Sequence, residues 1–284
     1  MVIDFNFHLT KPEHGHPWVR EWIRSNFSSE LEALVQQILT PAGLRQHLQA
    51  NEIDWAVGLA DISPITTGWT GNEFVGELCT AANKLPDPLA GPRGRLVPFA
   101  SLNPFIVNDL ASELTRLVDA YGFGGLKIYP TYHHHYPNDT RMVPLYAKAQ
   151  ELGLPVLTHT GSSSFKGARI KYGDPLLWDD VAIDFPELTI LLAHAGRPFW
   201  YEQAFWMARR HANVYLEISG LPARKLLEYF PRLEEIAEKV IYGSDWPGNF
   251  DLKRNVDAIR SLPITDRAKQ AILYDNAARL IRLA

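Results

Sequence analysis

The chain has 284 residues, of which 46% are hydrophobic, a formal net charge of −4 at pH 7 and a single cysteine. A chain of this length can bury a full-sized core, its mildly acidic balance gives no basic footprint for nucleic acid, and one cysteine excludes an internal disulfide. No apolar run approaches the ~20 residues that cross a bilayer. We therefore expect a globular cytoplasmic protein with no nucleic-acid or membrane partner.

The first expected strand, residues 2–9, alternates polar and apolar side chains. Successive side chains of a strand point to opposite faces, so Asp4, Asn6 and His8 should share one face and the apolar residues between them the other. An exposed strand with its polar side in water would give the same pattern. Its meaning therefore depends on whether later strands bring matching groups to the same place.

Seven further strands are expected, each followed by a helical segment. The strands cover residues 53–60, 95–102, 125–130, 155–159, 188–194, 214–219 and 240–245. Helical spacing of apolar residues is found over 28–48, 72–83, 107–121, 143–152, 175–184, 199–211, 222–238 and two stretches at the end of the chain. We expect loops at 10–27, 66–71, 86–94 and 161–172.

Eight strand-plus-helix units fill residues 1–284 and leave no remainder for a second domain. Alternating strands and helices favour a parallel sheet, and eight such units in a chain of this size most naturally close into a barrel. The alternative is an open doubly wound sheet, but no Gly-rich dinucleotide fingerprint follows the first strand. The predicted fold is a single-domain α/β protein, the (β/α)8 TIM barrel.

Polar residues interrupt the apolar runs where the expected strands end. In such a barrel the active site lies at the C-terminal ends of the strands. Any one of these residues could be a cap that the following loop satisfies, but a shared site explains so many of them better. They are Asn6 and His8, Lys127 and Tyr129, His159, His194, Glu217 or Ser219, and Asp245.

Two histidines, a carboxylate and a neutral oxygen donor form a set that suits zinc and similar divalent ions. A bound ion would lower the pKa of its water towards ~7. Asp245 could then ligate the ion and take the proton of the water, while His194 could hydrogen-bond the water or polarise the substrate.

At these residues the sequence resembles the amidohydrolase superfamily. It is most similar to the amidohydrolase-related branch that includes aminocarboxymuconate semialdehyde decarboxylase, aromatic-acid decarboxylases and lactonases. Each matching segment is weak alone, but their order and spacing are specific. They are Ile3-Asp4-x-Asn6-x-His8, Pro155-Val156-Leu157-Thr158-His159-Thr160-Gly161, Leu192-Ala193-His194-Ala195-Gly196, Gly243-Ser244-Asp245-Trp246-Pro247 and Asp275-Asn276-Ala277-Ala278-Arg279-Leu280.

The resemblance implies one divalent ion, usually zinc, held at the positions of Asn6, His8, His159 and Asp245. It also implies that His194 activates the water or the substrate. Proteins of this branch often self-associate, so the resemblance favours a homo-oligomer.

Asn6 departs from the family pattern, which has histidine at this position. An amide oxygen is a poorer zinc ligand than imidazole. Three outcomes stay open: a weak ligand at Asn6, an ion held by the other three residues and water, or a site without metal. Loss of the imidazole would also favour manganese or another harder ion.

Four residues are candidates for substrate binding, and three of them have a plainer alternative. Lys127, beside Tyr129, could bind a substrate carboxylate, although a carboxylated lysine or a buried ion pair would also fit. Arg197 could hold a carboxylate with two hydrogen bonds, or it could cap a helix. Trp246 could pack on a flat substrate or serve in the core.

The function predicted first is a metal-dependent hydrolase that cleaves an amide, ester or lactone of a small carboxylate-bearing compound. The first alternative is a non-oxidative decarboxylase of an aromatic or dienoic acid. The second, which follows from Asn6, is a metal-free lactonase or an inactive barrel that binds a ligand or partner.

Overall fold

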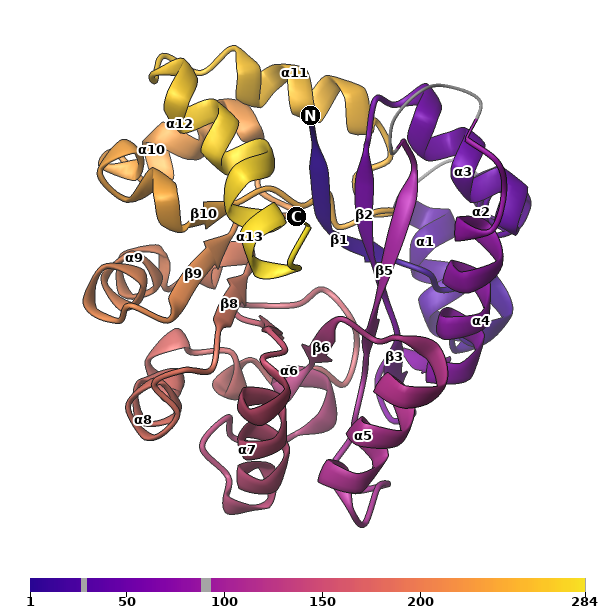
Figure 1. Ribbon diagram of the computed structural model, residues 1–284, viewed down its shortest axis with the longest axis horizontal. Coiled ribbons are helices and arrows are strands. Elements are labelled where there is room, and N and C mark those ends of the chain that lie inside the picture. The colour runs from indigo at the N-terminus through magenta and orange to yellow at the C-terminus, as the bar shows by residue number, and fades with distance from the viewer. Residues whose placement is uncertain (27–29, 88–92, 284) are drawn as a thin grey trace.

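The computed structural model describes residues 1–26, 30–87 and 93–283. Its central sheet has eight parallel strands in the order β1-β2-β5-β6-β7-β8-β9-β10 (Figure 1). The N–H of Phe5 donates to the carbonyl of Tyr242 and that of His8 to Trp246, both at 3.0 Å, so the two edges of the sheet meet. The predicted barrel is thereby confirmed. The strands are β1 Ile3–His8, β2 Trp55–Leu59, β5 Arg95–Ala100, β6 Gly125–Ile128, β7 Val156–His159, β8 Ile190–Ala193, β9 Val214–Glu217 and β10 Val240–Ile241.

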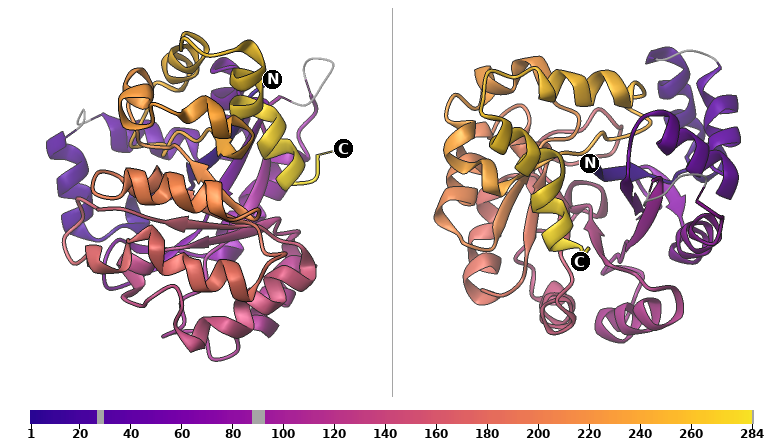
Figure 2. Two further views of the ribbon diagram at one scale, coloured as in Figure 1. Left: turned by 90° about the vertical axis from the view of Figure 1, so that its left-hand side faces the viewer. Right: turned by 45° about the horizontal axis from the view of Figure 1, so that its top comes forward.

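Helices surround this barrel on its outside (Figures 1 and 2). Most follow a strand and return the chain to the start of the next, as a parallel sheet requires. They are α1 Pro17–Asn26, α2 Leu31–Ile38, α3 Pro41–Ala50, α4 Asn72–Asn83, α5 Leu110–Tyr121, α6 Pro130–His133, α7 Val143–Leu152, α8 Asp179–Asp184, α9 Tyr201–Arg210, α10 Leu226–Tyr229, α11 Leu252–Arg260, α12 Asp266–Gln270 and α13 Asn276–Leu280.

Two hydrophobic clusters hold the barrel together. The larger one fills the space between the strands and the helices. The smaller one fills the barrel interior, where Ile3 and Phe5 of β1 pack with Ala277 and Ala278 of α13. Figure 1 shows α13 crossing the barrel close to the N-terminus of the chain. One end of the barrel is therefore closed by α13, and chemistry is confined to the opposite end, where the strands terminate.

Two segments of the N-terminal third differ from the sequence-based expectation. Residues 10–27 contain the helix α1, which starts with a proline in its first turn. The stretch expected as one helix over 28–48 contains two, because Pro41 begins α3 and the Thr40 side chain caps it by accepting the N–H of Gly43. The expected start of that stretch, residues 28–29, lies outside the described residues.

Two further segments also differ. The loop expected at 66–71 contributes to an antiparallel hairpin of β3 (Asp61–Ser63) and β4 (Gly68–Thr70). The helix expected over 222–238 is divided into short pieces, with α10 ending at Tyr229 just before Phe230 and Pro231. Proline cannot continue the hydrogen-bond ladder of a helix, so the chain breaks there.

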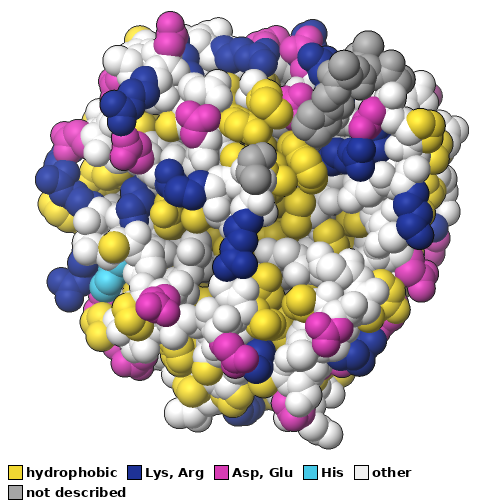
Figure 3. Space-filling view, viewed as in Figure 1, with side chains coloured by type: hydrophobic (Ala, Val, Ile, Leu, Met, Phe, Trp, Pro, Cys, Tyr) yellow, Lys and Arg dark blue, Asp and Glu magenta, His cyan; other side chains and the backbone are white. Residues whose placement is uncertain are grey.

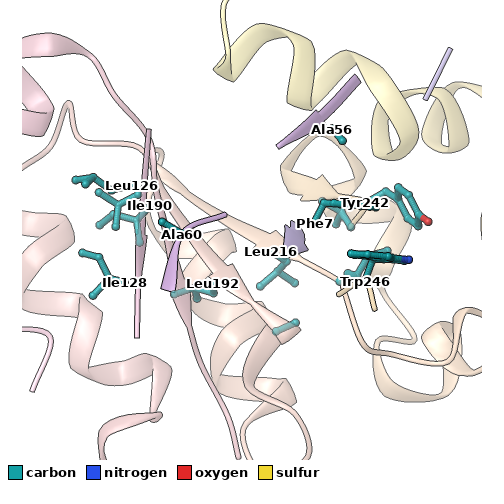
Figure 4. Packing of buried hydrophobic residues seen from close by; sticks show 14 of the residues in the cluster. Phe7, Ala56, Ala60, Leu126, Ile128, Ile190, Leu192, Leu216, Tyr242 and Trp246 are labelled. Atoms are coloured by element: carbon teal, nitrogen blue, oxygen red, sulfur yellow. The ribbon is translucent and has the colours of Figure 1, made fainter. Parts of the chain in front are cut away.

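Strand β1 does not keep the simple alternation that its sequence suggests. Its pairing with β2 has an irregularity between Asp4 and Phe7. Ile3 and Phe5 point into the barrel, whereas Phe7 packs outside it on Trp246, with ring centroids 4.4 Å apart and planes 2° from parallel (Figure 4). One irregular step in the pairing is enough to change which face the following residues use.

Asp4 is fully buried beside this irregularity. Its Oδ1 accepts the N–H groups of Asn6 (3.2 Å) and Ser244 (2.8 Å), so Asp4 joins β1 to the segment after β10. Within the described residues its Oδ2 has no hydrogen-bond partner. Burial raises the pKa of Asp4 from 3.8 to about 6, against the lowering effect of the bonds to Ser244 and Asn6.

We expect Asp4→Asn to become increasingly stable relative to wild type as the pH rises. A carboxyl whose pKa is raised in the folded state stabilises that state below about pH 4, and this contribution is lost as the pH rises through about 6. Over this pH range the free energy of unfolding of the wild type should fall by ~3 kcal/mol because of Asp4. The amide side chain of the variant does not titrate, so the variant should not lose this stability. Denaturant unfolding of both proteins between about pH 4 and 8 measures the difference. A difference as flat as that of the exposed control Asp119→Asn would contradict this prediction.

The surface carries mixed charge. In Figure 3, Lys and Arg side chains are interspersed with Asp and Glu side chains over the visible face. None of the helices in the described ranges combines the length and hydrophobicity needed to cross a lipid bilayer.

Candidate active site

A pocket of about 210 Å³ lies beside the C-terminal ends of the strands. Its wall includes six of the side chains singled out in the sequence. Helices α1 and α2 contribute its outer wall through Val19, Ile23, Leu31 and Val35. The predicted site residues on the wall are His8, Tyr129, His159, His194, Arg197 and Asp245.

His8, Asp245 and Arg197 lie together in this wall. The Nε2 of His8 lies 3.3 Å from Oδ1 of Asp245, and the Nη2 of Arg197 lies 4.0 Å from Oδ2. Burial alone would raise the pKa of Asp245, but His194, His8 and Arg197 together hold this pKa well below its usual range. The carboxylate is therefore ionised at neutral pH and is a weak proton acceptor.

Arg197 keeps part of its guanidinium free for a ligand. Its Nη1 donates to the carbonyl of Gly220 at 2.7 Å, which fixes the direction of the side chain. Among the described residues, no carboxylate accepts a hydrogen bond from Arg197. The residue is held by its backbone as well, because its carbonyl accepts the N–H of Ser162 at 2.7 Å. Gly161, with φ +91°, permits this approach, since a Cβ there would lie 2.1 Å from the same carbonyl oxygen.

His194 and Asp245 both have left-handed backbone conformations, with φ of 65° and 63°. Non-glycine residues rarely adopt such angles. The surrounding structure supports both: the carbonyl of His194 accepts the N–H of Arg197 at 3.0 Å, and the N–H of Asp245 donates to the carbonyl of Asn6 at 2.9 Å. These turns at the strand ends aim both side chains at the pocket instead of continuing the strand.

The two histidines on the β7–β8 side are neutral. The His159 and His194 rings meet edge to face, with centroids 4.7 Å apart. Burial lowers the pKa of His194 to about 3 and lowers that of His159 well below its usual value. The Nε2 of His159 lies 3.2 Å from the carbonyl of Ser162, and the Nδ1 of His194 lies 3.1 Å from the carbonyl of Ser219. Carbonyls only accept, so these ring nitrogens carry the protons.

Aromatic side chains form much of the remaining wall. Tyr129 stacks on Tyr132 with centroids 5.6 Å apart, and its hydroxyl donates to the carbonyl of Ala60 at 2.8 Å. Tyr132 also contacts His159 and, edge to face, Phe165. Trp22 of α1 also meets Phe165 edge to face, with centroids 5.1 Å apart. The wall is therefore suited to a small, flat, apolar ligand body.

Two predicted substrate-binding residues lie away from the pocket wall. Trp246 is fully buried against Phe7 in the outer core, so the prediction that it contacts the substrate is wrong. Lys127 is also fully buried and is absent from the wall. It pairs in register with Leu157, two residues before His159, and therefore lies one layer deeper in the barrel. Direct contact of Lys127 with a substrate carboxylate is not supported.

The four predicted metal ligands do not form a coordination shell as they are arranged. His8 and Asp245 are adjacent, but the Nε2 of His159 is directed at the Ser162 carbonyl. Asn6 turns its Nδ2 to Glu217 and Ser219, and its neutral Oδ1, which is buried and has no hydrogen-bond partner among the described residues, is the atom left to bind an ion. In the described ranges, no three His, Cys, Asp or Glu residues are placed to hold a metal. The predicted ligand set stays a prediction, and no step below is assigned to an ion.

Two residues around the site received no specific role from the sequence, although Glu217 was among the polar residues noted at the expected strand ends. Glu217 is fully buried at the end of β9 and bonds to Asn6 and Ser219. Burial raises the pKa of Glu217 and lowers that of Lys127, while the opposite charge of each partner counteracts the shift. Asp61 in β3 also lies on the pocket wall. The available signal was a polar residue at the end of an apolar strand for Glu217, and directly after the expected strand 53–60 for Asp61.

Comparison with known proteins identifies the relatives of this barrel. A family model described as amidohydrolase matches residues 11–283. The match begins after β1, so Asn6 and His8 lie outside it.

Solved structures with the same fold cover nearly the whole chain. One is an uncharacterised TIM-barrel protein of Bordetella bronchiseptica, with a TM-score of 0.78, 22% identity and coverage of 99% of this chain and 98% of that one. Another is 5-carboxyvanillate decarboxylase of Novosphingobium aromaticivorans with bound manganese (TM-score 0.70, 14% identity, coverage 99% and 97%). A third is 2,6-dihydroxybenzoate decarboxylase from Rhizobium (TM-score 0.65, 18% identity, coverage 99% and 98%). At these identities the likeness establishes the fold.

Proposed function

Because the chain belongs to the amidohydrolase family, we propose that it is a non-oxidative decarboxylase of a small aromatic carboxylic acid. The observation that carries this proposal is the His8–Asp245 pair, which shares one aromatic-lined pocket with the guanidinium of Arg197. Two solved structures of the same fold are decarboxylases of aromatic acids, which supports the proposal. Decarboxylation thus replaces hydrolysis as the favoured reaction.

Arg197 and the aromatic wall have complementary roles in this proposal. The free guanidinium nitrogens of Arg197 bind the substrate carboxylate and orient it. The rings of Tyr129, Tyr132 and Phe165 hold the flat body and exclude water. A carboxylate loses localised charge as it becomes carbon dioxide, so an apolar surrounding disfavours the ground state more than the transition state.

His8 supplies the proton in the bond-breaking step. The ionised Asp245 orients the His8 ring and stabilises its protonated form. His8 transfers a proton to the ring carbon that bears the carboxylate, the bond from that carbon to the carboxylate breaks, and its electron pair returns to the ring. Carbon dioxide leaves, the product carries hydrogen in place of the carboxylate, and His8 regains a proton from solvent. The step needs no oxidant or reductant.

Hydrolysis of a lactone is the second candidate, and the same pair of residues favours it. An ionised Asp245 beside His8 is also the arrangement of a general base, in which His8 takes a proton from water. Arg197 would then stabilise the oxyanion of the tetrahedral intermediate. The two reactions differ in their products and can be separated by one assay.

The test uses the full-length chain with a panel of hydroxylated and methoxylated benzoic acids, labelled with carbon-13 in the carboxyl group, and with aromatic lactones. We expect labelled carbon dioxide and, in deuterium oxide, one deuterium at the vacated ring carbon. His8→Gln should suppress both signals, whereas Glu234→Gln, an exposed substitution on the surface, should leave them unchanged. Parallel reactions with chelator and with added manganese or zinc measure any dependence on metal.

Release of acid from a lactone, without labelled carbon dioxide from any acid of the panel, would overturn the proposal in favour of hydrolysis. Decarboxylation that His8→Gln leaves intact would overturn the role of His8. Decarboxylation that chelator abolishes and manganese restores would show that an ion participates, and the roles of His8 and Asp245 would then have to include its binding.

A further inference from the structure

A chain of buried polar groups lies beneath the pocket and uses none of the groups assigned to substrate. Its centre is Glu217, whose Oε1 accepts the backbone N–H of Ser219 at 2.8 Å. Its Oε2 accepts the hydroxyl of Ser219 at 2.7 Å and the Nδ2 of Asn6 at 3.0 Å. All three residues are fully buried. In this arrangement both carboxyl oxygens act as acceptors, as those of an ionised carboxylate do.

The charge of Glu217 is balanced by Lys127. The Nζ of Lys127 is buried and has no hydrogen-bond partner among the described residues, and Glu217 is the carboxylate that most strongly favours its charged form. A buried ion left without its counterion is strongly destabilising. The depth of Lys127, below the level of His159, therefore suits a role in supporting Glu217.

The hydroxyl of Ser219 connects this network to His194. Ser219 Oγ lies 3.0 Å from the Nδ1 of His194, and the carbonyl of Ser219 lies 3.1 Å from the same atom. The hydroxyl has donated its hydrogen to Glu217, so towards His194 it can only accept. Both partners of Nδ1 are thus acceptors, and Nδ1 must carry a proton. In a neutral imidazole, the other nitrogen, Nε2, then holds a lone pair.

The Nε2 of His194 is the atom left for the ligand. His194 lines the pocket, and none of the described residues forms a hydrogen bond with its Nε2. The ring is buried, and burial disfavours the charged form of an imidazole. Its pocket side is consequently an acceptor, suited to a hydroxyl or another donor on the substrate or to a bound water.

We propose that Glu217 is a positioning residue that directs the Ser219 hydroxyl away from His194 Nδ1, so that with the Ser219 carbonyl it holds His194 in the Nδ1–H tautomer and presents the lone pair of Nε2 to the substrate. Asn6 belongs to this network as a donor to Glu217 and Ser219. This accounts for an amide at the position where the family resemblance implies a histidine ligand. The assignment of the tautomer is independent of the reaction, and only its catalytic consequence rests on the proposed function.

The test distinguishes two substitutions that have opposite expected effects. In Glu217→Gln, one carboxylate oxygen is replaced by an NH2 group. This NH2 must face either the backbone N–H of Ser219, which is itself a donor, or the Ser219 hydroxyl. In the second arrangement the hydroxyl accepts from the amide and turns its hydrogen to His194 Nδ1, which moves the imidazole proton to Nε2. In Ser219→Ala, the carbonyl of residue 219 still accepts from Nδ1, and the tautomer is retained.

Nitrogen-15 NMR of the full chain, labelled at its ten histidines, reports the tautomer directly. The signal that His194→Gln removes identifies the residue, and His211, bonded to Asp179 at 2.6 Å, is an internal reference. We expect protonated Nδ1 and unprotonated Nε2 in wild type, in Ser219→Ala and in the surface control Glu234→Gln. Glu217→Gln should show protonated Nε2.

Activity gives a second measure on any substrate that the enzyme turns over. Glu217→Gln should lower kcat by about tenfold or more with a smaller change in KM, because the tautomer affects the reacting complex more than carboxylate binding. A wild-type His194 protonated at Nε2 overturns the proposal even if Glu217→Gln does not fold. So does a folded Glu217→Gln with the wild-type tautomer. If no acid is decarboxylated, the proposed function fails while the NMR result still decides the tautomer.

Discussion

Replacing Asp245 with Asn is expected to lower kcat/KM by about a thousandfold, the scale of losing an acid–base pair. The carboxylate lies 3.3 Å from His8 and orients its ring, and in the proposed reaction it stabilises the imidazolium that delivers the proton. An amide has nearly the same shape but no charge, and half of its polar surface consists of donors that would face the N–H of His8. The effect should therefore appear mainly in kcat, measured by steady-state assay on a competent substrate.

The backbone makes this substitution a clean test. Asp245 has φ 63°, a left-handed conformation that asparagine tolerates better than most residues. The fold of the variant should therefore be kept, and circular dichroism with thermal unfolding verifies that. The matched control is Asp257→Asn on α11, where the carboxylate pairs with Arg260 at the surface. Turnover by Asp245→Asn within a few-fold of the control would refute a catalytic role for Asp245.

The sequence predicted the parts of the site that depend on strand ends alone. His8, His159 and Asp245 follow apolar runs, and closing a parallel barrel brings the ends of those runs to one mouth. The 3.3 Å separation of His8 and Asp245 agrees with that reasoning. The register of adjacent parallel strands also places residues at a common height in the barrel. His159 pairs with Ala193, and Ala193 pairs with Glu217. A polar residue one step beyond this level, such as His194, reaches the pocket.

The depth of a side chain in the barrel, and the direction in which it points, were harder to predict from residue types. Lys127 and Tyr129 are two positions apart on the same segment, yet only Tyr129 reaches the pocket. Residues two positions apart on a barrel strand belong to successive layers of the interior, and Lys127 lies in the deeper one. Trp246 directly follows Asp245, whose left-handed backbone turns the chain so that the indole packs outside on Phe7. A backbone angle of this kind has no reliable mark in the sequence when the residue is not glycine.

The outer wall was missed for a different reason. Residues 10–27 are rich in His, Pro and Trp, a composition that favours a loop, but residues 17–26 form α1. Two signals were available: Pro17 in the first turn, and the spacing of Val19 and Ile23 on one face. That face is apolar because it covers the pocket, so this segment bears on function as well as on fold.

Replacing Arg197 with Met is expected to raise the KM for a carboxylate substrate by about a hundredfold. A charged, desolvated pair of hydrogen bonds contributes roughly 1.5–3 kcal/mol, and the apolar side chain of Met cannot supply either bond. The guanidinium is placed for this contact because Nη1 is fixed on Gly220 and the remaining nitrogens have no carboxylate within hydrogen-bond distance in the described chain. Arg197→Lys should be intermediate, since it keeps the charge but loses the two-pronged geometry.

A neutral ligand separates recognition of charge from general damage to the pocket. The methyl ester of the same acid lacks the carboxylate charge, so its affinity, measured by titration calorimetry, should change little between wild type and Arg197→Met. Arg224→Met, at an exposed surface position, is the matched control. Equal weakening of the acid and the ester would mean that Arg197 shapes the pocket through its contacts with Gly220 and Ser162. An acid bound by Arg197→Met as tightly as by wild type would exclude the carboxylate anchor, and with it the first step of the proposed reaction.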